Sequence, residues 1–322
     1  MLNKENGSKI MKNYPEITVV MPVFNTVAYL DSAVESVLCQ TFENFELLAI
    51  NDGSTDGSLY RLEQWASKDP RMRVLSQENR GASAARNVGI SQAKGNFIYF
   101  MDSDDILNRD ALGTCYEYCR RDQVDFVFFD AETLNDGTFD SALVDKFNYK
   151  RTGIESMIMP GRATFEKLLK SSEFFSPVWL LFIDLNFLKK IGLTFNENIV
   201  HEDDLFTSLL FLEAQKARYI PASFFIRRLR VGSFMMVPYS MKNIHSYFVM
   251  GTKLLEYAKK NSSVREIIDL YLKEMIDAAV WKAHDMPLKK RINILMICLR
   301  RWRRYVRIKT LFVLLFKKYT GS

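Results

Sequence analysis

The 322-residue sequence predicts an α/β fold in which helices cover a mostly parallel β-sheet. Short β-branched and aromatic runs alternate with segments whose apolar residues recur at helical spacing, which is the pattern of successive β-α-β units. The chain is 48% hydrophobic and 13% aromatic. That composition provides a large core and excludes a disordered chain or a small disulfide-stabilised domain. Polar clusters directly follow three predicted strands, at the sheet edge where ligands bind in such folds.

Strands and helices alternate regularly through the first 130 residues. The expected strands are residues 17–23, 45–50, 73–76, 96–101, 124–129 and one within 218–230. The expected helices are 28–40, 59–67, 83–93, 111–121 and most of 243–283. The polar, Asp-rich connection over 133–153 is longer than packing requires, and we interpret it as a flexible or substrate-covering loop.

The net charge of +6 is concentrated at the C-terminal end. Residues 286–322 contain eleven Lys and Arg and no acidic residue, which leaves 33 basic and 38 acidic residues elsewhere. Nucleic-acid-binding proteins carry their basic residues on the reading domain, so no nucleic-acid partner is expected. Apolar and aromatic residues alternate with the basic ones, which is typical of a helix lying on an anionic membrane. The alternative is a helix that packs on the body with its charges in water.

Neither a membrane span nor a signal peptide is expected. No apolar run reaches the ~18 residues that a spanning helix needs. The first sixteen residues are polar and lack the apolar centre of a signal peptide.

The sequence DSDD at residues 102–105 follows the predicted strand 96–101. Closely spaced carboxylates repel one another unless a cation lies between them. Their hard oxygen atoms suit Mg²⁺ or Mn²⁺, which usually complete their coordination with phosphate oxygens. The alternative is a solvated turn in which Asp104 or Asp105 caps the following helix.

Two further segments contain polar residues that turn formation or helix packing does not fully explain. Asp52 directly follows a strand and is a candidate for ligand recognition, although the surrounding Gly, Asp and Ser also fit a structural turn. Residues 81–89, GASAARNVG, begin a helix with small residues that permit close backbone approach. Packing explains the alanines there but not Arg86 and Asn87.

Three consecutive acids, Glu202, Asp203 and Asp204, begin an apolar helix after His201. Acidic residues at this end complement the helix dipole. The functional alternative is a general base that deprotonates a hydroxyl nucleophile.

As a set, five segments resemble the motifs of the family 2 glycosyltransferases, which are inverting enzymes with the GT-A fold, a Rossmann-like nucleotide-diphospho-sugar transferase fold. They match in order and spacing over roughly residues 16–230: VMPVFN (20–25), NDGSTD (51–56), GASAARNVG (81–89), DSDD (102–105) and ED (202–203). The sequence is most similar in character to the bacterial enzymes that build capsule, O-antigen or lipooligosaccharide (lipopolysaccharide) repeats.

The resemblance implies roles for individual residues. Those of the nucleotide-sugar site are Pro22, Phe24, Asn25, Asp52, Gly81, Arg86, Asn87, Asp102, Ser103, Arg228 and Arg230. Within this set, Asp52 would accept a hydrogen bond from uracil, and Arg228 and Arg230 would neutralise the leaving diphosphate. Asp104, with Asp102, would hold Mn²⁺ or Mg²⁺. Asp203 would be the catalytic base, and Glu202 would support it or bind the acceptor.

The implied enzyme moves a hexose or N-acetylhexosamine from a UDP-sugar to a glycan hydroxyl, with an undecaprenyl-diphosphate-linked acceptor as one candidate. A Gln-x-x-Arg-Trp processivity signature is absent, which favours nonprocessive transfer. The sequence does not distinguish galactose, glucose and N-acetylhexosamine donors, nor does it indicate an oligomeric state. Two alternatives stay open: a sugar-phosphate nucleotidyltransferase, and a membrane-docked binding module without catalysis.

The resemblance also divides the chain. We expect a disordered leader over 1–15 and a GT-A catalytic domain over 16–232, with a nucleotide-sugar half (about 16–132) and an acceptor half (about 133–232). A helical extension over 233–286 and a basic, membrane-associating tail over 287–322 complete the chain. The expected location is the cytoplasm, at the inner face of the cell membrane.

Overall fold

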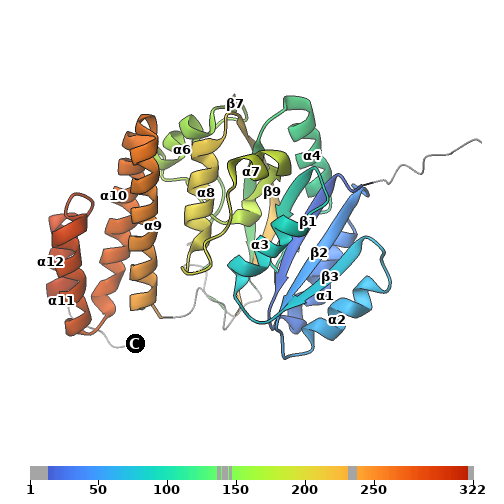
Figure 1. The fold of residues 1–322 in the computed structure, drawn as a ribbon, viewed down its shortest axis with the longest axis horizontal. Helices are drawn as coiled ribbons and strands as arrows, with labels where there is room; N and C mark the ends of the chain where they lie inside the picture. Colours follow the sequence, from blue (N-terminus) through green and yellow to red (C-terminus); the bar gives the residue numbers. More distant parts are fainter. Residues whose placement is uncertain (1–13, 136–138, 140–143, 145–146, 231–237, 318–322) are drawn as a thin grey trace, which may run out of the picture.

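The computed structural model describes residues 14–135, 139, 144, 147–230 and 238–317 (Figure 1). The leader expected at 1–15 therefore lies almost entirely outside the described residues, as does much of the connection expected at 133–153. The boundary expected at 232–233 lies outside them too.

Nine strands of the described chain form one sheet, in the order β3-β2-β1-β4-β8-β6-β9-β5, with β7 also paired to β9. The N-terminal half is parallel, and its strands are β1 (Ile17–Val23), β2 (Phe45–Asp52), β3 (Met72–Gln77) and β4 (Phe97–Phe100). The helices between them are α1 (Val27–Leu38), α2 (Ser58–Ala66) and α3 (Ala82–Gln92). All eight residues of β2 are buried, as expected for a strand covered on both faces.

The second half adds strands of both directions. Strand β8 (Leu181–Asp184) runs antiparallel between β4 and β6 (Phe126–Leu134), and β9 (Ala217–Arg228) is parallel to β6. The two-residue strands β5 (Ile106–Leu107) and β7 (Ile158–Met159) run antiparallel to β9. Six strands, β1 to β4, β6 and β9, thus point the same way. The predicted α/β fold with a mostly parallel sheet is confirmed.

The helices of this half pack on both faces of the sheet, in the two apolar clusters of the core. They are α4 (Ala111–Asp122), α6 (Gly161–Lys170), the short 3-10 helix η1 (Val178–Leu180), α7 (Leu185–Ile191) and α8 (Glu202–Glu213). Helix α3 approaches the sheet closely because Gly89 faces Val20, and a Cβ atom at position 89 would lie 2.2 Å from a Val20 methyl group. The small residues of segment 81–89 therefore do serve packing, as their composition suggested.

The C-terminal part is helical, as expected, and lies on one side of the molecule, with α6 and α8 between it and the sheet (Figure 1). Its elements are α9 (Met241–Lys260), η3 (Ser262–Val264), α10 (Arg265–Lys282), η4 (Ala283–Asp285), α11 (Leu288–Ile297), the π-helical turn η5 (Cys298–Trp302) and α12 (Ile308–Phe316). One buried apolar cluster extends continuously from the sheet into these helices, so they share a core with the sheet.

The basic tail is packed on one of its faces. Trp302 stacks on Phe248 with ring centroids 5.5 Å apart, and Arg307 forms an ion pair with buried Asp277. The opposite face exposes apolar side chains, three on α11, one on η5 and three on α12: Leu288, Ile292, Met296, Leu299, Ile308, Phe312 and Phe316. The alternative of a tail packed on the body thus describes its inner face only. No helix in the described chain is long and apolar enough to cross a membrane.

Candidate active site

The candidate site lies where the carboxyl ends of β1, β2 and β4 meet the start of α8 and the end of β9. Asn25 and Asp102 follow β1 and β4, Asp52 is the last residue of β2, and Glu202 is the first residue of α8. Parallel strands place their carboxyl ends at one edge of a sheet, which is why segments distant in sequence meet here.

Arg86 of α3 connects three carboxylates at this edge. Its NH1 atom donates to Glu202 (2.8 Å) and Asp203 (3.3 Å), and NH2 donates to Asp102 (3.0 Å). The guanidinium also lies 5.4 Å from the centre of the Phe195 ring. The Arg86 residue is only 4% exposed, so these ion pairs lie in a region of low dielectric constant, where they are strongest. Its positive charge holds Asp102 beside the first turn of α8.

Asp203 has an electrostatic environment suited to a general base. Burial, opposed by Arg86 and reinforced by the negative charges of Glu202 and Asp102, raises the pKa of Asp203 to about 8. Its second oxygen, Oδ2, accepts a hydrogen bond from the backbone N–H of Val178 at 3.4 Å. General bases are most effective when their pKa lies near the working pH, and the deprotonated form of Asp203, which can accept a proton, becomes the main form above about pH 8.

The turn at residues 102–105 presents two partly exposed carboxylates. Asp104 Oδ2 accepts a hydrogen bond from Arg230 at 2.6 Å, and Asp102 Oδ1 accepts one from Arg86. Their other oxygens have no hydrogen-bond partner within the described chain, and the two side chains are 21% and 31% exposed. Asp105 differs because it is buried and accepts the backbone N–H of Arg228, an environment in which burial and neighbouring acids raise its pKa.

These carboxylates fit a divalent cation that is bound mainly by its substrate. No group of three or more His, Cys, Asp or Glu side chains placed to bind a metal occurs in the part of the chain that the structure describes. Mg²⁺ and similar ions commonly use one or two carboxylates together with substrate phosphates and water. The free oxygens of Asp102 and Asp104 supply that number of ligands.

Arg228 and Arg230 lie beside the same turn. Both guanidinium groups are 5.4 Å from the centre of the Tyr29 ring, and Arg228 Nε donates to the backbone carbonyl of Asp104. The structure thus gathers both predicted arginines at Asp104. It also adds Tyr29, an aromatic residue of α1 that we did not predict and that no local sequence signal distinguished from a core residue.

Asp52 is buried and fixes the loop that precedes α3. Its carboxylate accepts hydrogen bonds from Gln77 Nε2 (2.6 Å) and from the backbone N–H groups of Arg80 (2.9 Å) and Gly81 (2.8 Å). Gly81 has a φ of +88°, a backbone conformation that favours glycine. Since a carboxylate has about four acceptor positions, one position on Asp52 stays available to a ligand.

The residues that follow β1 are held in place by hydrogen bonds to the loops after β2 and β4. Asn25 Oδ1 accepts the backbone N–H of Thr55 at 2.8 Å, and the hydroxyl of buried Ser103 pairs with Thr26 at 2.9 Å. Phe24, by contrast, is 47% exposed and Pro22 is half-buried. The Phe24 ring is thus available to stack on a planar ligand, whereas Asn25 and Ser103 shape the loops around it.

Asn87 was assigned to the nucleotide-sugar site, and the structure gives it a different role. Its side-chain amide donates to the carbonyl of Phe195 and to Glu197, and its oxygen accepts the N–H of Phe195. Both polar atoms therefore hold the 195–197 segment. Asn87 thus positions Phe195, which in turn contacts Arg86.

Comparison with known proteins gives a match to the family model described as glycosyl transferase family 2, over residues 18–185. The glycosyltransferase GlyG of Streptococcus pneumoniae is 31% identical over 229 residues, which cover 70% of this chain and 74% of GlyG. GlyA of the same organism is 30% identical over 224 residues, 68% of this chain but only 31% of GlyA. The chain thus matches less than a third of the length of GlyA.

Two solved structures share the fold. S. aureus TarS 1-349 in complex with UDP-GlcNAc has a TM-score of 0.63 and 20% identity, with coverage of 90% of this chain and 89% of TarS 1-349. The mannosyltransferase PcManGT from Pyrobaculum calidifontis, in complex with GDP-Man and Mn²⁺, has a TM-score of 0.58 and 16% identity, with coverage of 94% and 86%. The expected GT-A-type fold with a C-terminal helical region is therefore confirmed.

Proposed function

Because this chain belongs to glycosyl transferase family 2 and is a bacterial-type glycosyltransferase, we propose that it moves a hexose or N-acetylhexosamine from a UDP-sugar to a glycan hydroxyl, with inversion. The observation that carries the proposal is the Arg86 cluster, which holds the nucleotide-side carboxylate Asp102 against the Glu202-Asp203 pair. An inverting transferase needs its base close enough to the donor for one acceptor hydroxyl to reach both, and this cluster brings the carboxylates of the two sides together.

We assign the donor to the edge formed by β1, β2 and β4. Phe24 offers an exposed ring to the base, and Asp52 keeps one acceptor position for a nucleobase N–H. Pro22, Asn25, Gly81 and Ser103 shape the surrounding loops. TarS and PcManGT were crystallised with nucleotide sugars, the latter also with Mn²⁺, which supports a nucleotide-sugar donor.

Asp102 and Asp104 would hold Mn²⁺ or Mg²⁺, which when bound supplies positive charge to the diphosphate. Arg228 and Arg230 lie beside Asp104 and stabilise the charge that develops as the nucleoside diphosphate leaves. Asp203 takes the proton from the acceptor hydroxyl, which attacks C1 of the sugar from the face opposite the leaving group. Glu202 shares Arg86 with Asp203 and keeps the guanidinium in place.

The tail supports a proposal about location. The seven exposed apolar residues form one stripe along α11 and η5, at spacings of four, four and three, and another on α12, at spacings of four. Nine exposed Lys and Arg of the described tail flank them: Lys289, Lys290, Arg300, Arg301, Arg303, Arg304, Arg307, Lys309 and Lys317. Such a surface suits an anionic bilayer. We therefore assign the enzyme to the inner face of the cell membrane, where a lipid-linked acceptor of surface polysaccharide synthesis would be available.

A screen of UDP-sugars tests the function. The purified protein is mixed with UDP-Glc, UDP-Gal, UDP-GlcNAc and UDP-GalNAc, with and without Mn²⁺, and UDP release and the melting temperature are measured. We expect one of these UDP-sugars to be hydrolysed with release of UDP, and to raise the melting temperature of the protein, when Mn²⁺ is present. A response to GDP- or dTDP-sugars alone would overturn the UDP assignment, and no response to any nucleotide sugar would overturn the proposal.

A further inference from the structure

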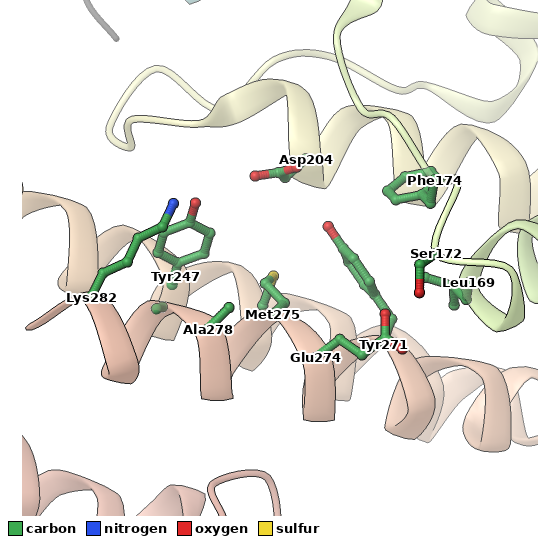
Figure 2. A pocket seen from close by; sticks show the side chains of 11 residues that line it. Leu169, Ser172, Phe174, Asp204, Tyr247, Tyr271, Glu274, Met275, Ala278 and Lys282 are labelled. Atoms are coloured by element: carbon green, nitrogen blue, oxygen red, sulfur yellow. The ribbon is translucent and has the colours of Figure 1, made fainter. Parts of the chain in front are cut away.

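A cavity of about 270 Å³ lies between the start of α8 and the helices α9 and α10, on the side of α8 that faces the C-terminal part (Figure 2). Asp204 enters from α8, and Phe174 from the segment after α6. Tyr247 comes from α9, and Tyr271, Glu274 and Lys282 come from α10. This volume approaches the lower end of the ~300–1,000 Å³ range of small-molecule pockets. The cavity uses none of the residues assigned to the donor.

Several polar groups at the cavity lack protein partners. In the described chain, the Glu274 carboxylate, the Lys282 ammonium and the hydroxyls of Tyr247 and Tyr271 form no hydrogen bond or salt bridge, although Tyr271 is only 6% exposed. Figure 2 shows the Tyr271 hydroxyl directed into the cavity, with the Tyr247 hydroxyl and the Lys282 ammonium facing Asp204. Glu274 and Lys282 are exposed and Tyr247 is half-buried, so these groups are open to a polar ligand that enters the cavity.

The cavity is adjacent to the proposed base. Successive residues of an α-helix point about 100° apart, because a turn contains ~3.6 residues. Asp203 therefore contacts Arg86 on the donor side, whereas Asp204 faces the cavity. One chain segment contacts both carboxylates, since the Ser176 side chain donates to Asp204 and the Val178 N–H donates to Asp203. A ligand in the cavity would contact Asp204, the residue that directly follows the proposed base Asp203.

The chemistry of the lining selects an uncharged, hydroxyl-rich ligand. Asp204 and Glu274 outnumber the single cation Lys282, so a phosphate or carboxylate would meet net repulsion. A sugar ring offers hydroxyl donors to the two carboxylates and oxygen acceptors to Lys282 and the phenols. Its apolar C–H face matches the aromatic surfaces of Tyr271 and Phe174, whose rings lie 5.5 Å apart.

We propose that this cavity binds an uncharged sugar of the acceptor glycan, next to the sugar whose hydroxyl reacts at Asp203. The assignment rests on the proposed transferase function. Because Asp203 and Asp204 face different sides of α8, the ring in the cavity is not the one that reacts. It anchors the acceptor and thereby directs the neighbouring hydroxyl to the base.

The substitution Ala278→Trp tests the proposal, because Ala278 is an exposed residue of α10 that lines the cavity. The indole would fill the cavity without replacing a buried side chain. Lys273→Trp is the matched control, since Lys273 is exposed on the same helix and does not line the cavity. Circular dichroism and melting temperature verify that both variants fold.

Two measurements read out the effect. Saturation-transfer NMR with the methyl glycosides of glucose, galactose and N-acetylglucosamine should detect binding to the wild type and the Lys273→Trp variant, and lose it in the Ala278→Trp variant. With bacterial membrane glycolipid extract as acceptor, the ratio of sugar transfer to UDP-sugar hydrolysis by water should fall at least tenfold in the Ala278→Trp variant. A second variant, Lys282→Met, should lower the same ratio.

The outcomes separate this proposal from the proposed function. Normal UDP-sugar hydrolysis with an unchanged transfer ratio and unchanged glycoside binding in the Ala278→Trp variant would overturn the cavity assignment alone. If the wild type consumes no nucleotide sugar, the proposed function fails. The NMR experiment still decides in that case, because glycoside binding that is insensitive to Ala278→Trp, or absent from the wild type, rejects the cavity as a sugar site.

Discussion

Asp203 lies 3.3 Å from the guanidinium of Arg86, although the two residues are separated by more than a third of the chain. Arg86 belongs to the parallel half of the sheet and Asp203 to a helix of the second half, so their contact closes the site between the two halves. The positive charge of Arg86 also lowers the pKa of a carboxylate that burial would otherwise raise further. Position and protonation of the proposed base thus depend on the same residue.

Asp203→Asn should abolish transfer while the protein still binds its nucleotide sugar. The amide keeps the shape of the carboxylate but cannot accept the proton of the attacking hydroxyl. General-base catalysis typically contributes about 10²–10⁴-fold, so kcat should fall by that factor. Calorimetric titration with the nucleotide sugar should give a Kd within about threefold of wild type. Wild-type turnover by this variant would eliminate Asp203 as the base.

The pH dependence of transfer should follow the ionisation of Asp203. Only the deprotonated carboxylate can accept a proton, and its pKa is raised to about 8. Therefore kcat/KM, which reports the free enzyme, should rise roughly tenfold per pH unit below pH 8 and level off above it. Initial rates between pH 5.5 and 9.5 measure this. A rate that is flat from pH 5.5 upward would contradict the environment described here.

Arg86→Met should destabilise the fold strongly. Removing one partner of a buried ion pair leaves uncompensated charge, at a cost of roughly 3–5 kcal/mol. Here three carboxylates lose their shared cation. The matched control is Arg80→Met, whose exposed pair with Glu197 should contribute at most about 1 kcal/mol. Urea unfolding at neutral pH measures both, and equal effects would show that the Arg86 cluster does not stabilise the fold.

The parallel half of the fold was predictable because its strands are continuous apolar runs and its helices are periodic. Strand β8 was not predictable, because its four residues are placed by antiparallel pairing with β4 and β6 rather than by a local pattern. Strands β5 and β7 have only two residues each, which is too short for a sequence pattern to predict them.

The site shows the same division between local pattern and tertiary arrangement. Asp102, Asp104 and the acids of α8 follow recognisable motifs, and their positions were predicted. The engagement of Asn87 with Phe195 depends on a loop that folds back from a distant part of the chain. The sequence does not distinguish the cavity residues of α10 from an ordinary helix face; these are Tyr271, Glu274 and Lys282. They become the wall of a cavity only because α10 packs beside α8.

Asp104→Asn should weaken the response to metal. Asp104 has one oxygen free and one bonded to Arg230, and the amide removes the charge that attracts a divalent cation. We expect the Mn²⁺ concentration for half-maximal activity to rise at least tenfold, and chelation by EDTA to stop wild-type transfer reversibly. Asp110→Asn is the control, because Asp110 lies just before α4 and bonds Thr41 instead. An identical Mn²⁺ requirement in both variants would remove Asp104 from the metal site.

Phe312→Ser should weaken binding to anionic membranes. Phe312 is 62% exposed in the α12 stripe, and its ring lies 4.7 Å from that of Phe316. Burial of such a side chain in the bilayer contributes about 1.5–3 kcal/mol, so its loss should lower the partition coefficient at least tenfold, since tenfold corresponds to about 1.4 kcal/mol. Co-sedimentation with phosphatidylcholine vesicles, with and without phosphatidylglycerol, measures this.

The matched control is Tyr60→Ser, since Tyr60 is 67% exposed on α2, far along the chain from the tail. Its loss should leave vesicle binding unchanged. Binding should also require phosphatidylglycerol and weaken with added salt, because exposed Lys and Arg flank the stripes and their attraction to anionic lipids is screened within a Debye length. Equal binding of the Phe312→Ser and Tyr60→Ser variants would mean that the apolar face of α12 does not enter the bilayer, and the tail would then have to act through its charges alone.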